Sequence, residues 1–278
     1  MTPQEQAAFE ELLANCANEP ISFPGAIQPH GLLVTLSEPG LQILQISANV
    51  KELLGRDPQS VIGLPLDKLL GRKHVKPLRD MLQQPLLSGE APLRVKLNGR
   101  TFDGLLHRHD GLLLLELELH AGNFAPGSIA GNLTNLGRML QRLQGATSLQ
   151  ALYDVSVREI QAMTGYDRVL IYRFQEEGHG QVIAEASEPS MEVFNGLFFP
   201  ASDIPQQARE LYRRNWLRII PDADYQAVPL VPRLRPDTQA PLDLSFATLR
   251  SVSPIHCQYM KNMGVLSSMS ISLLKDGE

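Results

Sequence analysis

Apolar and polar residues alternate along several short runs in the N-terminal part of the chain, a pattern typical of β-strands. Two such runs within residues 32–47 flank a Glu-Pro-Gly turn at 38–40, which predicts a hairpin. Residues 49–84 form short helical segments broken by glycine and proline, and three more strands follow within 93–119. This order predicts a first α+β domain built on an antiparallel sheet.

A different pattern begins after a stretch of Gly, Ala and Pro at 121–130, which we interpret as a linker. Residues 131–164 place apolar side chains at helical spacing, and exposed stripes of this kind often pair with a second subunit. Beyond them the sequence predicts strands at 167–174, 180–187 and 265–274, helices near 204–215 and 253–262, and a proline-rich loop over 221–241. The second domain is therefore also α+β on an antiparallel sheet.

The N-terminal segment differs from both domains. Residues 4–15 have the spacing of a short amphipathic helix, and the chain from Cys16 to Gly31 is rich in proline. Prolines at this frequency favour an extended path, so we expect an arm that lies against another part of the protein.

Composition narrows the classes of function. A length of 278 residues suggests about two domains, and the net charge of −5 gives no basic surface for nucleic acid. Two cysteines are too few for a disulfide framework or a cysteine-rich metal site, and they suit the cytoplasm. The N-terminus lacks the pattern of a signal peptide and no apolar run is long enough for a membrane span, so we expect neither export nor membrane insertion.

Five long segments occur together in one order: CANEPISFPGAIQPHG, TGYDRVLIYRF, FPASDIPQQARELY, LRIIPDADYQAVPL and LRSVSPIHCQYMKNMGV. In these segments the chain closely resembles the bacteriophytochromes. The resemblance implies a PAS domain and then a GAF domain that holds the linear tetrapyrrole biliverdin. Proteins of this family report red or far-red light to a C-terminal output module, commonly a histidine kinase.

The resemblance also predicts the domain boundaries. An arm with the chromophore cysteine would cover residues 1–18, the PAS domain 19–120, the linker 121–130 and the GAF domain 131–278. Family members continue beyond the point where this sequence stops, so we expect a GAF domain truncated at its C-terminal end, without PHY and histidine kinase modules. The loop at 221–241 resembles the family's lasso, through which the N-terminal arm would pass to form a knot.

Two thiols compete for the chromophore. Cys16 resembles the family cysteine that forms a thioether with the vinyl group of biliverdin, although a lone terminal thiol has no such role by itself. Cys257 follows His256, whereas relatives that attach phycobilins carry their cysteine before that histidine, at the place of Ile255. On a helix the side chains of His256 and Cys257 diverge, so Cys257 is expected to be a small packed residue.

One helix face carries Ser253, His256, Tyr259, Met260 and Met263, which predicts a continuous stripe along a pocket. By resemblance His256 contacts the pyrrole nitrogens, while a lone histidine is otherwise more often a core residue.

The PASDIP segment carries Asp203 and Ile204. The family places there an aspartate whose backbone carbonyl accepts the pyrrole N–H groups. Helix capping by Ser202 or Asp203 ahead of Pro205 is the alternative, and it is compatible with that role.

Biliverdin carries two propionates, which need cations or hydroxyl groups in an apolar site. Arg218 and Arg250 match the family positions for that task, as do Ser268 and Ser270, which share one face of a strand. Arg218 beside Arg213 and Arg214 would otherwise read as solvated surface. The aromatic residues Tyr172, Phe199, Tyr212 and Tyr259 resemble the walls around the ring that isomerises, although aromatic residues also serve as ordinary core.

The sequence thus favours a biliverdin-binding photosensory fragment that dimerises through its GAF helices, with no catalytic residue and no metal site. A PAS–GAF dimerisation scaffold without chromophore is the alternative. An enzyme would need a nucleophile with a base in reach, which the diverging His256 and Cys257 do not provide. A GAF domain that binds a cyclic nucleotide would be detected by a nucleotide titration.

Overall fold

The computed structural model describes residues 19–82, 90–120 and 129–274. The chain divides into two compact units: one joins the segment up to His120 with the segment from Gln207 onward, and the other covers Ala121–Gln206. The predicted helix at 4–15 and most of the predicted linker lie outside the described residues. The compact units combine segments from both ends of the chain. This division does not test the predicted domain boundaries, which stay a prediction.

The larger unit contains a seven-stranded antiparallel sheet in the order β1-β11-β3-β2-β6-β5-β4. Its strands are β1 (Ala26–Ile27), β2 (Gly31–Leu36), β3 (Ile43–Ser47), β4 (Glu90–Leu97), β5 (Arg100–His109), β6 (Leu112–Leu119) and β11 (Val228–Val231). The predicted hairpin is β2–β3, and the three further predicted strands are β4, β5 and β6, so this part of the prediction is confirmed.

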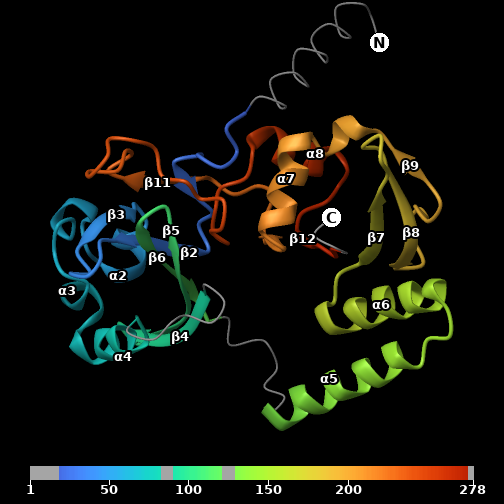
Figure 1. The fold of residues 1–278 in the computed structure, drawn as a ribbon, viewed down its shortest axis with the longest axis horizontal. Coiled ribbons are helices and arrows are strands. Elements are labelled where there is room, and N and C mark those ends of the chain that lie inside the picture. Colours follow the sequence, from blue (N-terminus) through green and yellow to red (C-terminus); the bar gives the residue numbers. More distant parts are fainter. Residues whose placement is uncertain (1–18, 83–89, 121–128, 275–278) are drawn as a thin grey trace, which may run out of the picture. The chain divides into compact units, whose positions relative to one another are not determined.

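Strand β11 corrects the prediction of a loop over residues 221–241. It lies between β1 and β3, where Pro229 is paired with Ala26 and Leu230 with Ser47. In Figure 1 this orange segment lies beside the blue strands, although almost two hundred residues separate them in the sequence. The sheet of the first predicted domain is therefore completed by a strand from the second.

Both faces of the sheet are covered. Helices α2 (Val50–Leu54), α3 (Asp67–Leu70) and α4 (Arg72–Leu82), with the 3-10 turn η1 (Pro58–Ser60), pack on one face, where Leu113, Leu115 and Leu117 point into the larger core. On the other face Leu112 and Leu114 pack against Leu242, Leu244 and Leu249 from the C-terminal part of the chain. Burial on both faces explains why β6 reads as an almost unbroken run of leucine.

Polar contacts add to this union of the two segments. The buried amide of Gln45 donates its Nε2 hydrogen bond to the carbonyl of Pro232 at 2.9 Å. The guanidinium of Arg235 lies between the carboxylates of Asp110, in the β5–β6 turn, and Asp237. The proline-rich segment is therefore held to β3 by one contact and to the turn between β5 and β6 by the other.

The rest of the larger unit contains helix α7 (Gln206–Arg214), helix α8 (Pro254–Asn262) and the antiparallel pair β10 (Leu217–Ile220) and β12 (Ser268–Ile271). Ile220, Ala223 and Met260 form a small core that holds α8 against β10. Both helices and the strand β12 match the predicted elements, whereas β10 was not predicted.

The smaller unit contains helices α5 (Ile129–Gln144) and α6 (Leu149–Thr164), followed by the three-stranded antiparallel sheet β7 (Arg168–Phe174), β8 (Gly180–Ser187) and β9 (Phe198–Phe199) and the turn η2 (Ala201–Asp203). Ser148 caps α6 by accepting a hydrogen bond from the backbone N–H of Ala151 at 3.1 Å, and Gly165 ends the helix in the left-handed conformation. The predicted helices and the first two strands are confirmed.

Helices among the described residues are all too short or too polar to cross a membrane.

Candidate functional site

Arg218, on β10, is not the solvated surface residue that its neighbours in sequence suggest. Its guanidinium lies 3.6 Å from the ring centroid of Tyr212 on α7, a cation–π contact. The guanidinium nitrogen Nη1 donates to the hydroxyl of Ser272 at 3.2 Å, while the buried Nε has no partner among the described residues. Tyr212 and Arg218, two of the predicted site residues, are thus in direct contact.

Arg250 lies ahead of α8 and is held by the N-terminal arm. Its Nη1 donates to the backbone carbonyl of Ile21 at 2.9 Å, and its Nε is also buried without a described partner. Burial lowers the pKa of Arg250, an indication of how far this charge is removed from water. No described carboxylate forms an ion pair with either Arg218 or Arg250.

Strand β12 presents its hydroxyl groups beside Arg218. Ser270 is paired directly with Arg218 across the two strands, and Ser268 is paired with Ile220. Because side chains alternate along a strand, the next residue on this face is Ser272, which bonds Arg218 but was missed in the sequence. Its position two residues after Ser270 is the signal that identifies it.

Helix α8 divides the predicted stripe. Ser253 is its N-cap, with Oγ accepting from the backbone N–H of Ile255 at 3.2 Å. The rings of His256 and Tyr259 are stacked with centroids 6.4 Å apart, whereas Met260 is buried in the core and Met263 is exposed. The stripe is therefore not one continuous surface, and its chemistry lies with His256 and Tyr259.

The charge of His256 is set by its surroundings. Burial lowers the pKa of His256, and the positive charge of Arg250 lowers it further. The imidazole is accordingly neutral at pH 7, with one nitrogen that donates and one that accepts a hydrogen bond.

The two cysteines differ in what the structure describes. Cys16 lies outside the described residues. Cys257 is 8% exposed, and burial raises the pKa of its thiol, as expected for a small packed helix residue.

The remaining predicted site residues belong to the smaller unit. The rings of Tyr172 on β7 and Phe199 on β9 have centroids 6.1 Å apart, in a cluster that also contains Phe174 and Phe194. Asp203 ends the turn η2, its backbone N–H donating to the carbonyl of Pro200 at 3.1 Å, and Ile204 follows in an extended conformation.

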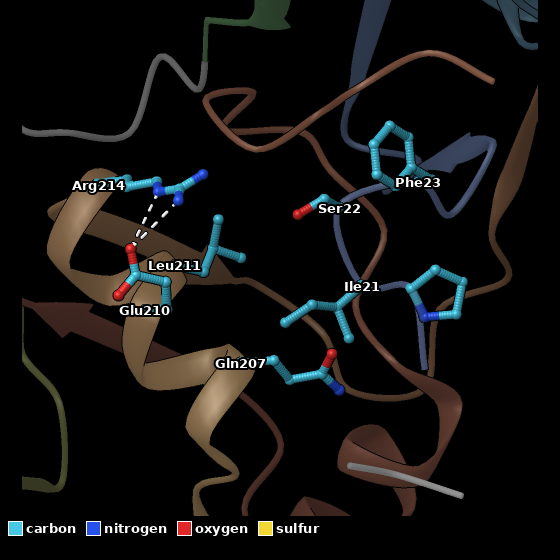
Figure 2. A pocket seen from close by; sticks show the side chains of 8 residues that line it. Ile21, Ser22, Phe23, Gln207, Glu210, Leu211 and Arg214 are labelled. Atoms are coloured by element: carbon cyan, nitrogen blue, oxygen red, sulfur yellow. Dashed lines mark hydrogen bonds and ion pairs between the residues drawn. The ribbon is translucent and has the colours of Figure 1, made fainter. Parts of the chain in front are cut away.

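An open cleft of about 280 Å³ lies where the N-terminal arm meets α7. Figure 2 shows Ile21 of the arm facing Gln207 and Leu211, with an ion pair between Glu210 and Arg214 at one side. Small-molecule sites usually measure roughly 300 to 1,000 Å³, so this cleft alone is too small for a large ligand.

The residues of the larger unit fit a ligand with two carboxylates. Two half-buried guanidinium groups, each with a buried Nε that lacks a described partner, lie near serine hydroxyls, a neutral histidine and aromatic rings. A carboxylate would supply the missing acceptors and offset the buried charge. No group of three metal-ligating side chains occurs among the described residues.

Comparisons with known proteins identify the family. A PAS-fold model matches residues 16–120 and a GAF-domain model residues 148–278. The chain is 44% identical over 273 residues to cyanobacterial phytochrome B of Nostoc, covering 96% of this chain and 36% of that protein. It is 39% identical over 270 residues to the bacteriophytochrome of Pseudomonas aeruginosa, with 96% and 36% covered.

Solved structures are similar over almost the whole chain. The chromophore-binding domain of the Stigmatella aurantiaca bacteriophytochrome (Thr289His mutant, Pr state) is 47% identical, with a TM-score of 0.86 over 95% of this chain and 87% of that one. The chromophore-binding domain of an unusual bacteriophytochrome from R. palustris is 40% identical, also with a TM-score of 0.86, and covers 95% and 86%.

The fold and the comparisons thus define a PAS–GAF sensory region. The chain belongs to the phytochrome family, of which it represents the photosensory region. It spans about a third of the length of the curated relatives named above.

Proposed function

We propose that this chain is the chromophore-binding part of a red/far-red photoreceptor and that its ligand is biliverdin. The observation that carries the proposal is the pair of half-buried arginines, Arg218 and Arg250, each with a buried Nε that lacks a described partner. A linear tetrapyrrole with two propionates has the charge that such a pair requires. A guanidinium can otherwise form an ion pair with a carboxylate of its own chain. The described residues form no such ion pair with either arginine.

The roles of the residues follow from their chemistry. Arg218 and Arg250, with Ser268 and Ser270, bind the propionates, and Ser272 orients Arg218. His256, neutral because of burial and the charge of Arg250, exchanges hydrogen bonds with the pyrrole nitrogens.

The remaining site residues, according to the same proposal, contact the rings of the chromophore. Tyr172, Phe199, Tyr212 and Tyr259 supply aromatic contacts, and the segment with Asp203 and Ile204 offers a backbone carbonyl as acceptor. Biliverdin, when bound, supplies a conjugated system in which one double bond isomerises on absorbing light. The hydrogen bonds of the chain then rearrange around the new geometry.

Attachment would occur through Cys16. Its thiolate adds to a vinyl group, so that one S–C bond forms and the proton ends on the other vinyl carbon, which balances the reaction without an oxidant. The reaction is a single self-modification, so the region is a sensor and not an enzyme. Cys257 is a poor competitor, because the raised pKa of its buried thiol keeps it protonated.

In the full-length protein we expect PHY and histidine kinase modules to receive the signal, in the cytoplasm and without nucleic acid or membrane as partners. A homodimer through α5 and α6 fits the exposure of Leu136 and Leu140, which are 48% and 49% accessible.

The test is to add biliverdin to the purified chain and to its Cys16→Ser and Cys257→Ser variants, and to record red absorbance before and after denaturing electrophoresis. We expect the original chain and Cys257→Ser to keep the pigment through denaturation, and Cys16→Ser to lose it. Pigment retained by Cys16→Ser but lost by Cys257→Ser would move the attachment to Cys257. No red absorbance from any of the three proteins would refute the proposed function.

A second candidate function is a dimerisation scaffold without chromophore, favoured by the exposed leucines of α5. Leu140→Glu should then convert a dimer into a monomer, as measured by analytical ultracentrifugation, whether or not biliverdin is present. The scaffold alone would be supported by a dimer that takes up no pigment.

A further inference from the structure

Gln28 is a buried amide at the point where three segments of the chain meet. It follows β1 in the N-terminal arm and is 2% exposed. Its Nε2 donates one hydrogen bond to the carbonyl of Ile219 at 2.9 Å and another to the carbonyl of Arg250 at 3.2 Å. Both N–H groups of one amide are therefore used to join strand β10 to the segment ahead of α8.

The two carbonyls belong to the backbone around the two arginines of the site. Ile219 directly follows Arg218 on β10, and the second carbonyl is that of Arg250 itself. The side chain of Gln28 thus forms a bridge of two hydrogen bonds between the strand of one arginine and the backbone of the other. Buried hydrogen bonds of this kind hold their partners in one geometry, because a carbonyl left unpaired in the interior is costly.

Other contacts direct the same arm toward Arg250. The backbone N–H of Gln28 donates to the carbonyl of Leu249 at 2.8 Å, and the carbonyl of Ile21 accepts from the guanidinium of Arg250 at 2.9 Å. The arm therefore holds both the backbone and the guanidinium of Arg250. Its contact with the strand of Arg218 is the hydrogen bond donated by the Gln28 amide.

We infer that Gln28 is a positioning residue: its amide holds Arg218 and Arg250 in place relative to each other and thereby favours a ligand that presents a carboxylate to this pair. The inference rests on the proposed function and deepens it. An amide is required at this position, since a carboxylate has no N–H donor at neutral pH and an apolar side chain has none at all.

The matched control is Gln45. It is also buried, and its Nε2 also donates across the larger unit, to the carbonyl of Pro232 at 2.9 Å, but it contacts neither arginine. Replacing either glutamine with methionine removes a buried amide while keeping the size of the side chain, and only Gln28→Met alters the arginine pair.

The experiment measures equilibrium binding of biliverdin and of its dimethyl ester, in a Cys16→Ser background so that covalent capture does not obscure affinity. The ester has the same conjugated system but no carboxylates. The parent should prefer the free acid, and Gln28→Met should reduce that preference about tenfold, roughly the value of one hydrogen bond between a guanidinium and a carboxylate of the ligand. Gln45→Met should leave the preference unchanged.

The ratio of the two affinities separates positioning from unfolding, because a partly unfolded protein loses both pigments alike. Gln28→Asn provides a second variant that keeps a polar amide but is one methylene too short to reach both carbonyls, so it should also lose preference for the acid. An unchanged ratio in either Gln28 variant, or an equal loss in Gln45→Met, would overturn the inference alone. A parent that binds neither pigment would overturn the proposed function, and the inference with it.

Discussion

His256 and Arg250 form the most informative pair at the scale of single residues. No described carboxylate forms an ion pair with Arg250, and its positive charge acts on the imidazole nearby. Burial lowers the pKa of His256 in the same direction. Burial and the charge of Arg250 thus both keep the imidazole neutral. Of the two, only the charge can be removed by substituting another residue.

Replacing Arg250 with glutamine should raise the pKa of His256, because the nearby positive charge is lost while the burial remains. The histidine signals in an NMR titration of the chromophore-free chain would measure it. Arg218→Gln is the control, since Arg218 is not among the groups that shift His256.

His30 serves as an internal reference in the same spectra. Burial alone lowers the pKa of His30, so neither arginine variant should move it. A pKa of His256 that stays where it is in Arg250→Gln would contradict the electrostatic coupling.

Residues of the site differ in how far the sequence could identify them. Arg218, Arg250 and His256 stand in long family motifs, and helical spacing placed His256 and Tyr259 on one face. Gln28 also stands in such a motif, but its role depends on carbonyls about 190 and 220 residues away, which no local pattern reveals. Contacts between distant segments are the information that a single sequence lacks.

At the scale of secondary-structure elements, the hairpin of β7 and β8 is adapted to one aromatic ring. Gly180, the first residue of β8, lies directly under the ring of Tyr172 on β7, and the register shifts between Ile171 and Tyr172. A Cβ atom at Gly180 would collide with that ring. The glycine is therefore required by a close approach within the sheet.

Gly180→Ala should displace the ring of Tyr172 and lower the free energy of unfolding by about 1 to 3 kcal/mol, the usual cost of overpacking. Urea denaturation measures this cost. If Tyr172 contacts the chromophore, the red absorbance band of the pigmented protein should also shift.

Gly137→Ala on α5 is the matched control, because a Cβ there meets nothing within 4 Å. An alanine in place of a helical glycine should stabilise the protein, by about 0.5 to 1 kcal/mol. Equal stabilities of Gly180→Ala and the original chain would show that the ring is free to move away.

Elements in which apolar residues recur with a clear period were predicted correctly, and elements without such a period were missed. Strands β5 and β6 alternate or run apolar over eight residues or more, whereas β11 contains Pro229 and is followed by Pro232, which indicate a loop. The proline is tolerated because β11 is held by only a few pairs, to the two-residue β1 and to the end of β3. Tertiary pairing outweighed the local signal.

At the scale of the whole molecule, a buried acidic group joins the sheet to the C-terminal part of the larger unit. Glu116 on β6 accepts hydrogen bonds from the hydroxyl of Thr248 at 2.9 Å and from the backbone N–H of Leu249 at 2.7 Å. Burial raises its pKa to about 7, and burial lowers the pKa of His107, 3.7 Å away, to about 4. Between these values the two side chains form a neutral contact and not an ion pair.

The raised pKa of Glu116 makes stability depend on pH. Its contribution is fully present below the ordinary value of 4.5 and is lost as the pH rises through about 7. Glu116→Gln removes that loss, so the variant should gain on the original chain between pH 5 and 8, by up to about 3 kcal/mol.

Denaturation of both proteins at each pH would measure the difference. Glu118, whose pKa is also raised, and His107 are present in both, so their contributions largely cancel. A difference that does not change with pH would show that Glu116 is ionised in the folded protein throughout.

The strand order of the larger sheet also determines which parts of the chain can be separated without exposing a strand edge. A gene fragment that ended at residue 120 would encode six of the seven strands but leave the outer side of β3, which β11 covers, open to solvent. Open strand edges recruit other chains and promote aggregation. The PAS segment produced alone should therefore expose the edge of β3 and aggregate more readily than the whole region.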